Sequence, residues 1–412
     1  MEQYVLAVFA VVYLGMVLGR LPGLALDRAG VAVLGAIALI AGGVLSANRA
    51  WSAVDVPTIT LLFGLMVVSA QLRLGGFYTW LTRRIGAVPC SPAGLLALVI
   101  AAAALLSALL ANDIVCLAMT PILVEGCGRR GLSPLPYLLG LACAANIGSA
   151  ATLIGNPQNM LIGQVAALPF GPFLADAAAP TVASLAATWA IIAFLHRGRW
   201  AAPVRNFSVE APDFNLWQSS KGLAVLAVLV AAYLAGPWPR ELPTLALAGV
   251  LLLSRRMTSR RMFGLVDWQL LLLFMGLFVV NHAVAEVHLL DRLYAELSAL
   301  GLDPARPATL YGLTVILSNL VSNVPAVMLL LPAASSPQAA LLLSLASTLA
   351  GNLLLVGSIA NLIVAEQARP FGIHLGWAAH ARIGLPVTIA SLFITGAWLA
   401  WRWDALAVSA IR

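Results

Sequence analysis

Four short polar stretches interrupt otherwise apolar segments of this chain, and their residue types can bind small ions. Two are the dipeptides Asn112-Asp113 and Ser322-Asn323, and two are the pentapeptides GNPQN and GSIAN. An Asn side chain both donates and accepts hydrogen bonds, so it suits a small oxyanion or a partly dehydrated cation. The carboxyl group of Asp113 can hold a proton or a cation, and an ionisable residue within apolar surroundings is a functional hypothesis by default.

The candidate substrate- and ion-binding residues come from these stretches and from their flanks, with a possible Na⁺ site near Asn112, Asp113 and Asn323. Each also has a structural alternative: the acid can cap a helix, the Gly-containing stretches can be plain kinks, and the flanking residues can satisfy freed backbone groups. The sequence has no Walker A loop, zinc-protease helix or nucleophile elbow, so no catalytic residue is predicted, and no cofactor beyond Na⁺ or H⁺ as coupling ion. The full set is Asn112, Asp113, Asn146, Thr152, Gly155, Asn156, Asn159, Ser322, Asn323, Asn352, Gly357, Ser358 and Asn361.

The composition indicates a polytopic membrane protein. Of the 412 residues, 61% are hydrophobic and 9% charged, whereas soluble domains carry roughly 25% charged residues. The net charge of +7 comes from Arg residues in short connections between apolar runs. Such placement is typical of cytoplasmic loops rather than of nucleic-acid binding. The four Cys show neither CxxC nor Cys/His ligand spacing, so no disulfide framework or zinc site is predicted.

The polar stretches must be positioned by interrupted helices. A helix needs about 20 apolar residues to cross a bilayer. The limbs within 94–127 and 307–334 are shorter and predict re-entrant hairpins, while 136–168 and 338–367 predict crossings broken by Gly, Asn and Pro. Non-helical backbone at membrane depth is tolerated only where protein buries it or where it lines a cavity. Half-helices there present N–H groups to an anion and C=O groups to a cation.

Internal matches indicate a duplicated unit. Residues 54–69 (VDVPTITLLFGLMVVS) match residues 266–281 (VDWQLLLLFMGLFVVN) without a gap, and residues 106–121 match residues 317–332. A third match pairs GNPQNMLIG with GSIANLIVA. Three matches in the same order predict an internal repeat.

The duplication divides the chain into repeats 1–195 and 221–412, joined by a linker, 196–220. Each repeat is predicted to have five crossings. Because five is odd, the second repeat must begin on the opposite side of the membrane, which gives the inverted repeat of many secondary transporters. Most of the 23 basic residues then fall on one side, which the positive-inside rule assigns to the cytoplasm. The linker is therefore predicted to be cytoplasmic and both termini periplasmic, in the inner membrane.

Three motifs resemble those of a known group. ATLIGNPQNMLI is similar to the ATLIG-x-P-x-N signature of the ion transporter superfamily, which includes divalent anion–sodium symporters, citrate transporters and arsenical pump membrane proteins. SNLVSNVPAVMLLLP and ANDIVCLAMTPIL resemble hairpin motifs of its arsenite-efflux branch. The resemblance implies that a domain of hairpins and broken helices moves against a scaffold of the remaining spans, and it implies homodimers in part of the group. Dicarboxylate symporters carry Ser-Asn-Thr at both tips, whereas this chain has Ala-Asn-Asp at 111–113 and Ser-Asn-Val at 322–324.

The sequence thus predicts an all-α polytopic secondary transporter that moves a small anion or oxyanion by alternating access, coupled to H⁺ or Na⁺. Its predicted partners are this anionic substrate and the lipid bilayer, with a possible homodimer and no nucleic acid. Arsenite or antimonite efflux is one alternative, and Na⁺/H⁺ antiport through Asp113 is another. From different classes, a passive channel or a membrane enzyme with a buried polar site stays open.

Overall fold

The computed structural model describes residues 1–19, 21, 23–205, 207, 209–236 and 238–409, with side chains as far as Trp403. These residues are helical where they are regular, and one isolated bridge joins Leu132 to Ala201. The all-α fold predicted from the sequence is confirmed. Outside the described residues lie positions 20 and 22 of the predicted first repeat, 206 and 208 of the linker, and 237 and 410–412 of the second repeat.

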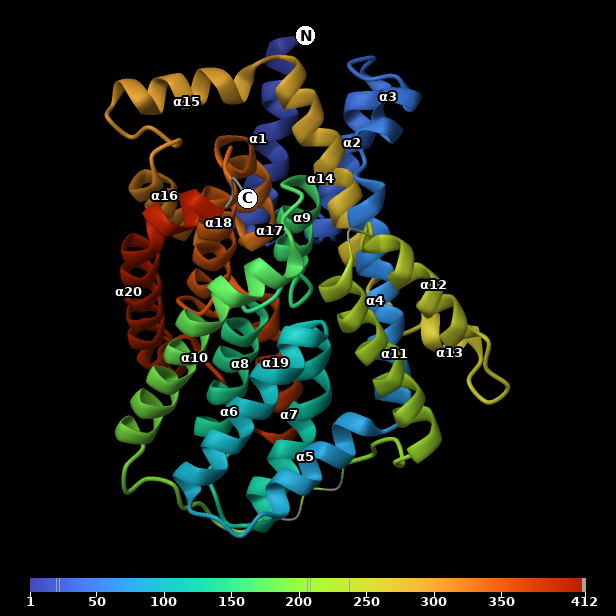
Figure 1. Ribbon diagram of the computed structural model, residues 1–412, viewed down its shortest axis with the longest axis vertical. Coiled ribbons are helices and arrows are strands. Elements are labelled where there is room, and N and C mark those ends of the chain that lie inside the picture. Colours follow the sequence, from blue (N-terminus) through green and yellow to red (C-terminus); the bar gives the residue numbers. More distant parts are fainter. Residues whose placement is uncertain (20, 22, 206, 208, 237, 410–412) are drawn as a thin grey trace.

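Among the described residues, each half of the chain has ten α-helices, and short helices occupy the same places in both halves (Figure 1). A six-residue helix (α3) and a five-residue helix (α13) take third place, and α5 and α15, of 11 residues each, take fifth place. The first half contains α1 (Glu2–Leu18), α2 (Arg28–Ala41), α3 (Ala47–Ser52), α4 (Val56–Leu74), α5 (Phe77–Ala87), α6 (Pro92–Leu109), α7 (Asn112–Arg129), α8 (Leu135–Ser149), α9 (Pro157–Val165) and α10 (Phe170–Leu195). The second contains α11 (Leu216–Ala235), α12 (Glu241–Leu252), α13 (Ser259–Phe263), α14 (Trp268–Glu286), α15 (Leu289–Ala299), α16 (Pro307–Val321), α17 (Asn323–Leu330), α18 (Pro337–Ala350), α19 (Ile359–Ala368) and α20 (Trp377–Ser409).

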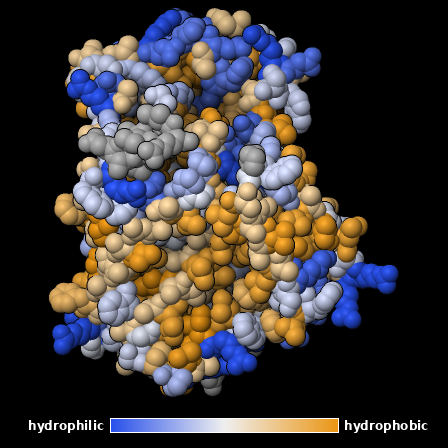
Figure 2. Space-filling model, in the orientation of Figure 1, coloured by the Kyte–Doolittle hydropathy of each residue, from blue (hydrophilic) through white to orange (hydrophobic). Residues whose placement is uncertain are grey.

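The surface and the helix lengths are those of a multi-pass membrane protein. Among the described residues, six helices are long and apolar enough to cross a membrane, namely α4, α6, α10, α11, α14 and α20. Shorter apolar helices include α1, α2, α8, α12, α16 and α18. Figure 2 shows hydrophobic residues over the middle of the visible face, with most hydrophilic residues at the upper end and others at the lower end and the right edge. The predicted division into crossings and re-entrant limbs stays a prediction.

Helix packing brings the four polar stretches into one region. The first limb of each hairpin packs on the first half of the broken helix from the same half of the chain, α6 on α8 and α16 on α18. The second limbs pack crosswise, α7 on α19 and α17 on α9. At Gly148 of α8, an added Cβ would lie 2.3 Å from the Cα of Ala104 on α6, so glycine permits this close approach. Crosswise packing therefore unites the halves around the helix breaks.

Among the described residues, four short helices of 6, 11, 5 and 11 residues were not predicted from the sequence, namely α3, α5, α13 and α15. Helices α5 and α15 lie at opposite ends of the long axis (Figure 1). Helix α11 begins at Leu216, within the predicted linker, because the side chain of Asn215 accepts the N–H of Gln218 at 3.0 Å and caps the helix. The linker also packs on the α7–α8 connection, where the N–H of Ala202 donates to the carbonyl of Gly131 at 2.9 Å.

Candidate functional site

The two hairpin tips carry buried amides with unused acceptors. Asn112 is the first residue of α7, and its Nδ2 donates to Oδ1 of Asn146 at 3.3 Å. Asn323 is the first residue of α17 and lies beside Gly351, where an added Cβ would stand 3.0 Å from its Nδ2. The Oδ1 atoms of both tip residues are buried and without a hydrogen-bond partner among the described residues. Since a buried acceptor without a partner is costly, these oxygens are candidate ligand contacts.

Asn159 and Asn361 fill the same role at the two helix breaks. Nδ2 of Asn159 donates to the carbonyl oxygens ten and seven residues earlier, at 3.3 and 3.0 Å. Nδ2 of Asn361 donates to the carbonyls at the same separations, at 2.9 and 3.2 Å. The first carbonyl of each pair lies at the end of α8 or α18, and the second lies in the break that follows. Carbonyls at the end of a helix lack intrahelical partners. Both side chains therefore close the breaks, which is the structural alternative for these two candidates.

Helix caps and glycines complete each break. Oδ1 of Asn156 accepts the N–H of Asn159 at 2.9 Å, and Oγ of Ser358 accepts the N–H of Ala360 at 3.2 Å. A Cβ on Gly155 would lie 2.3 Å from the nearest backbone carbonyl oxygen, so only glycine fits without a shift. A Cβ on Gly357 would meet its nearest neighbours at 3.1 Å. The start of α9 is the more crowded of the two breaks.

Asn146 joins the two halves of the chain. Its Nδ2 donates to Oδ1 of Asn352 at 2.8 Å and to Oδ1 of Asn361 at 3.1 Å. Its Oδ1 accepts from Oγ of Ser358 at 2.8 Å and from Nδ2 of Asn112 at 3.3 Å. The side chain is 2% exposed and uses both donors and its acceptor, so it positions the site from within a satisfied network.

Hydroxyl and amide groups that the sequence analysis missed surround Asn159. Oγ of Ser344 donates to Oδ1 of Asn159 at 2.7 Å, and Oγ1 of Thr348 lies 3.4 Å from the same oxygen. Nδ2 of Asn156 and Nε2 of Gln158 each donate to Oγ1 of Thr348 at 3.2 Å. When the two halves of the sequence are aligned so that Gly155 matches Gly357, Thr348 occupies the position that matches Asn146. The repeat offset was therefore a signal that could have found it.

The flanking candidates also have protein partners. Thr152 donates through Oγ1 to the carbonyl of Ala108 at 2.5 Å and accepts the N–H of Ile154 at 3.2 Å. The backbone carbonyl of Asn352 lies 3.0 Å from Nε2 of His380, a residue of α20 that is 1% exposed. His380 was missed because its contact is tertiary and no local pattern marks it.

Asp113, the neighbour of Asn112 at the first tip, faces a cavity. It is the second residue of α7, is half-buried, and lines a cavity of about 250 Å³ together with Arg73 and Asp267. Apolar residues of α4, the start of α9 and Ile363 of α19 form much of the remaining wall. Asp267 also caps α14 by accepting the N–H of Leu270 at 2.9 Å. Asp113 and Arg73 form no ion pair with each other among the described residues, so both can meet a ligand.

The predicted site residues thus divide into two groups. Asn146, Asn156, Asn159, Ser358 and Asn361 are bonded within the protein. Asp113 faces the cavity, and the tip amides retain free acceptors. Ser322 has φ 76°, a conformation rare for a residue with a side chain. A Na⁺ site near the tips stays a prediction.

Comparison with known proteins gives the family. Residues 4–343 match the citrate transporter family, CitMHS. The chain belongs to this family. It is 32% identical to the inner membrane protein YbiR of Escherichia coli over 78% of its own length and 82% of that protein. It is 29% identical to the silicon efflux transporter LSI3 of Oryza sativa subsp. japonica, covering 92% and 94% of the two chains. The crystal structure of the Alcanivorax borkumensis YdaH transporter is similar with a TM-score of 0.60 at 18% identity, covering 97% and 98% of the chains.

These similarities confirm the predicted membership of the ion transporter superfamily and the prediction of a transporter rather than an enzyme. The YdaH likeness concerns the fold alone. The family assignment leaves the cargo and the coupling ion to proposal.

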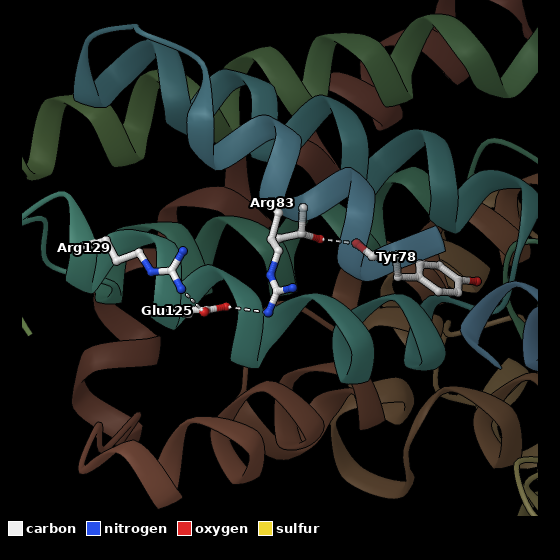
Figure 3. A network of polar contacts seen from close by, with 5 residues as sticks. Tyr78, Arg83, Glu125 and Arg129 are labelled. Atoms are coloured by element: carbon white, nitrogen blue, oxygen red, sulfur yellow. Dashed lines mark hydrogen bonds and ion pairs between the residues drawn. The ribbon is translucent and has the colours of Figure 1, made fainter. Parts of the chain in front are cut away.

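In this member of the citrate transporter family, a buried carboxylate ties the first hairpin to α5. Glu125 of α7 is 4% exposed and pairs with Arg83 of α5 at 3.3 Å and with Arg129 of its own helix at 2.5 Å. Figure 3 shows the carboxylate of Glu125 between the guanidinium groups of Arg83 and Arg129. Tyr78 lies on α5, the helix that carries Arg83. Arg130 donates to the carbonyls of Gly86, Val88 and Cys90 at 2.9–3.1 Å. The far end of α7 is therefore firmly attached to α5 while its tip faces the cavity.

Proposed function

We propose that this protein is a secondary active transporter that moves a small oxyanion or oxyacid by alternating access, with Asp113 as its proton-coupling group. The observation that carries the proposal is the position of Asp113, at the first tip, facing a cavity that also contains Arg73. A carboxyl group that faces a cavity at membrane depth is the kind of group that binds a proton on one side and releases it on the other.

The donors around the tips favour a compact, oxygen-rich cargo. Helices α7, α9 and α19 begin in this region, and the first N–H groups of a helix attract oxyanions. The free Oδ1 atoms of Asn112 and Asn323 can accept hydrogen bonds from hydroxyl groups. Donors and acceptors together match a partly protonated oxyacid better than a fully ionised anion.

Citrate fits the cavity less well than a small oxyacid. Ionised citrate brings three carboxylates, and the cavity offers one guanidinium, that of Arg73, beside the two carboxylates of Asp113 and Asp267. Like charges in apolar surroundings repel strongly, so a tricarboxylate would lack compensation. The relative named as a silicon efflux transporter supports a small oxyacid cargo and outward transport.

Arsenite or antimonite efflux is a second candidate within the same chemistry, favoured by the Asn-Asp tip. Both oxyacids are compact and carry hydroxyl groups. We also propose that the linker at 196–220 is cytoplasmic and that both termini are periplasmic. A Cys introduced at Glu210 should then react with a membrane-impermeant maleimide only after the cells are opened, and efficient labelling of intact cells contradicts this orientation.

The coupling role is tested by Asp113→Asn in proteoliposomes. Uptake of silicic acid, arsenite, phosphate and citrate is measured against imposed H⁺ and Na⁺ gradients, together with counterflow exchange. We expect the variant to lose uphill, H⁺-driven transport and to keep counterflow, because Asn resembles the protonated carboxyl group in shape. Asp55→Asn is the matched control, since Asp55 caps α4 by accepting the N–H of Thr58 at 2.8 Å and Asn caps nearly as well.

Other outcomes overturn the assignment. Normal uphill transport in the variant removes any coupling role and leaves Asp113 as a helix cap. Loss of Na⁺ dependence with a parallel loss of exchange assigns a cation site instead. Proton flux driven by Na⁺ without any oxyacid points to an antiporter, and the absence of uphill accumulation in the native protein points to a channel.

A further inference from the structure

A second pocket, far from the hairpin tips in sequence, lies where α11 begins and α12 ends. It has a volume of about 560 Å³ and is bounded by the first turns of α11 and by the connection from α12 to α13. Its lining residues are Trp217, Gln218, Lys221, Leu253, Ser254, Arg255 and Arg256. Three are cationic and none is acidic, so the pocket is complementary to an anion.

The cationic groups of this pocket are only partly used by the protein. Nζ of Lys221 donates to the carbonyls of Val250 and Leu251 at 3.1 and 3.4 Å. An ammonium group has three hydrogens, so one remains for a ligand in the pocket that Lys221 lines. The side chains of Arg255 and Arg256 are exposed and form no ion pair among the described residues. Ser254 accepts the N–H of Met257 at 3.1 Å and keeps its hydroxyl hydrogen free.

Apolar surface continues from the pocket along both helices. Trp217 is 70% and Leu253 is 82% exposed at its rim. Beyond them, α11 exposes Leu223, Val228 and Leu234, and α12 exposes Leu242, Leu245 and Val250. Figure 2 shows hydrophilic residues projecting at the edge where the α12–α13 connection lies in Figure 1, directly beside hydrophobic surface. Basic and aromatic residues at the end of an apolar helix face are typical of the membrane interface.

The matching part of the first half lacks this chemistry. The connection from α2 to α3, residues 42–46, reads GGVLS and has no charged residue. The basic residues are therefore not needed to form this connection. They occur at the end of the molecule for which the positive-inside rule predicts the cytoplasm.

We propose that this pocket binds the phosphodiester headgroup of an anionic phospholipid, whose acyl chains lie along the exposed faces of α11 and α12. The phosphate would meet Arg255 and Arg256, with Lys221 and the Ser254 hydroxyl behind it. Basic pockets at helix ends on the cytoplasmic side recognise anionic headgroups in this way. The inference does not depend on the cargo or on Asp113.

The test is lipid binding to delipidated protein in detergent, measured by native mass spectrometry with phosphatidylglycerol. The double variant R255Q/R256Q should bind this lipid about twenty-fivefold more weakly, about fivefold for each charge removed. The matched control R260Q/R261Q removes the same charge from α13, outside the pocket lining, and should change binding by less than about threefold. Single variants R255Q and R256Q report intermediate losses if the double variant unfolds.

Two further probes distinguish an anionic headgroup from a zwitterionic one, and a lipid from a free phosphate. Phosphatidylcholine, which is zwitterionic, should bind no better to the native protein than to R255Q/R256Q. Glycerol phosphate, which has the anion without acyl chains, should not displace phosphatidylglycerol. The proposal is overturned if R260Q/R261Q loses as much binding as R255Q/R256Q, if phosphatidylcholine binds as well as phosphatidylglycerol, or if glycerol phosphate displaces the lipid. It is also overturned if a second copy of the chain occupies the pocket, which would appear as a dimer that forms without lipid and only when the pocket is intact.

Discussion

The two hairpin tips share a frame but differ in charge and in backbone conformation. The first tip turns through Leu110 and Ala111 with ordinary negative φ values and places Asp113 against a cavity. The second tip turns through Ser322 at φ 76° and ψ 162°, a region that side chains rarely adopt, and carries no acid. One half therefore supplies an ionisable group and the other a constrained turn. Under the proposed function, coupling requires an ionisable group at one tip only.

The helix breaks, in contrast, are nearly equivalent. Asn159 and Asn361 satisfy carbonyls at the same two separations, and Asn156 and Ser358 both cap the following half-helix. Repeated bonding of this kind is required by the geometry of a broken helix, whatever the cargo. Under the proposed function, the tips would hold the groups that select a ligand, whereas the equivalent breaks build the frame.

The largest expected effect is at Gly155, and it tests how equivalent the breaks are. In Gly155→Ala the new Cβ would lie 2.3 Å from a backbone carbonyl oxygen, which cannot move as a side chain can. We expect a loss of about 3 kcal/mol in the free energy of unfolding, at the upper end for overpacked sites. Gly357→Ala, with its nearest contacts at 3.1 Å, should cost about 1 kcal/mol.

Unfolding in mixed micelles, followed by circular dichroism, measures both changes. Gly312→Ala is the control, because a Cβ there meets nothing within 4 Å. It should leave stability unchanged or slightly raise it, since Ala restricts the unfolded chain. If Gly155→Ala and Gly357→Ala cost the same, the first break is not the tighter one.

A smaller difference in stability is expected between the ion pairs that attach the helices α5 and α15. Glu125 is buried between two guanidinium groups, so Glu125→Gln should lower the free energy of unfolding by about 2 kcal/mol, less than for a fully buried pair because both Arg are partly exposed. The other short helix is tied to α1 by the exposed pair Arg292–Glu2. Glu2→Gln should cost about 0.5 kcal/mol or less. Thermal unfolding at low and high salt measures both, and an equal loss would mean that burial of Glu125 contributes nothing.

The helix ends near the polar stretches could be predicted from the sequence because their signal is local, whereas the re-entrant path of the hairpin limbs stays a prediction. Gly, Pro and Asn within apolar runs mark where helices end. Helices α6 and α7 together span 92–129, where two helical limbs were predicted over 94–127. Helices α5 and α15 were missed because their polar faces interrupt the apolar runs. Ser344, Thr348 and His380 were missed for another reason. No local pattern marks Ser344 or His380, and only tertiary packing reveals their partners. For Thr348 the alignment of Gly155 with Gly357 offered a signal that was not used.

A last pair of substitutions, each changing stability by about 1 kcal/mol or less, distinguishes the two turns themselves. Ser322 has a φ of 76°, which favours glycine, so Ser322→Gly should relieve strain and raise the free energy of unfolding by about 1 kcal/mol. At the first tip Ala111 has a φ of −57°; Ala111→Gly should therefore lower stability by about 0.5–1 kcal/mol, because glycine adds freedom to the unfolded chain without relieving strain. Chemical denaturation of the two variants side by side measures the difference, and opposite signs are expected. Destabilisation by both substitutions would mean that the second turn is not strained, and that the contrast between the tips lies in Asp113 alone.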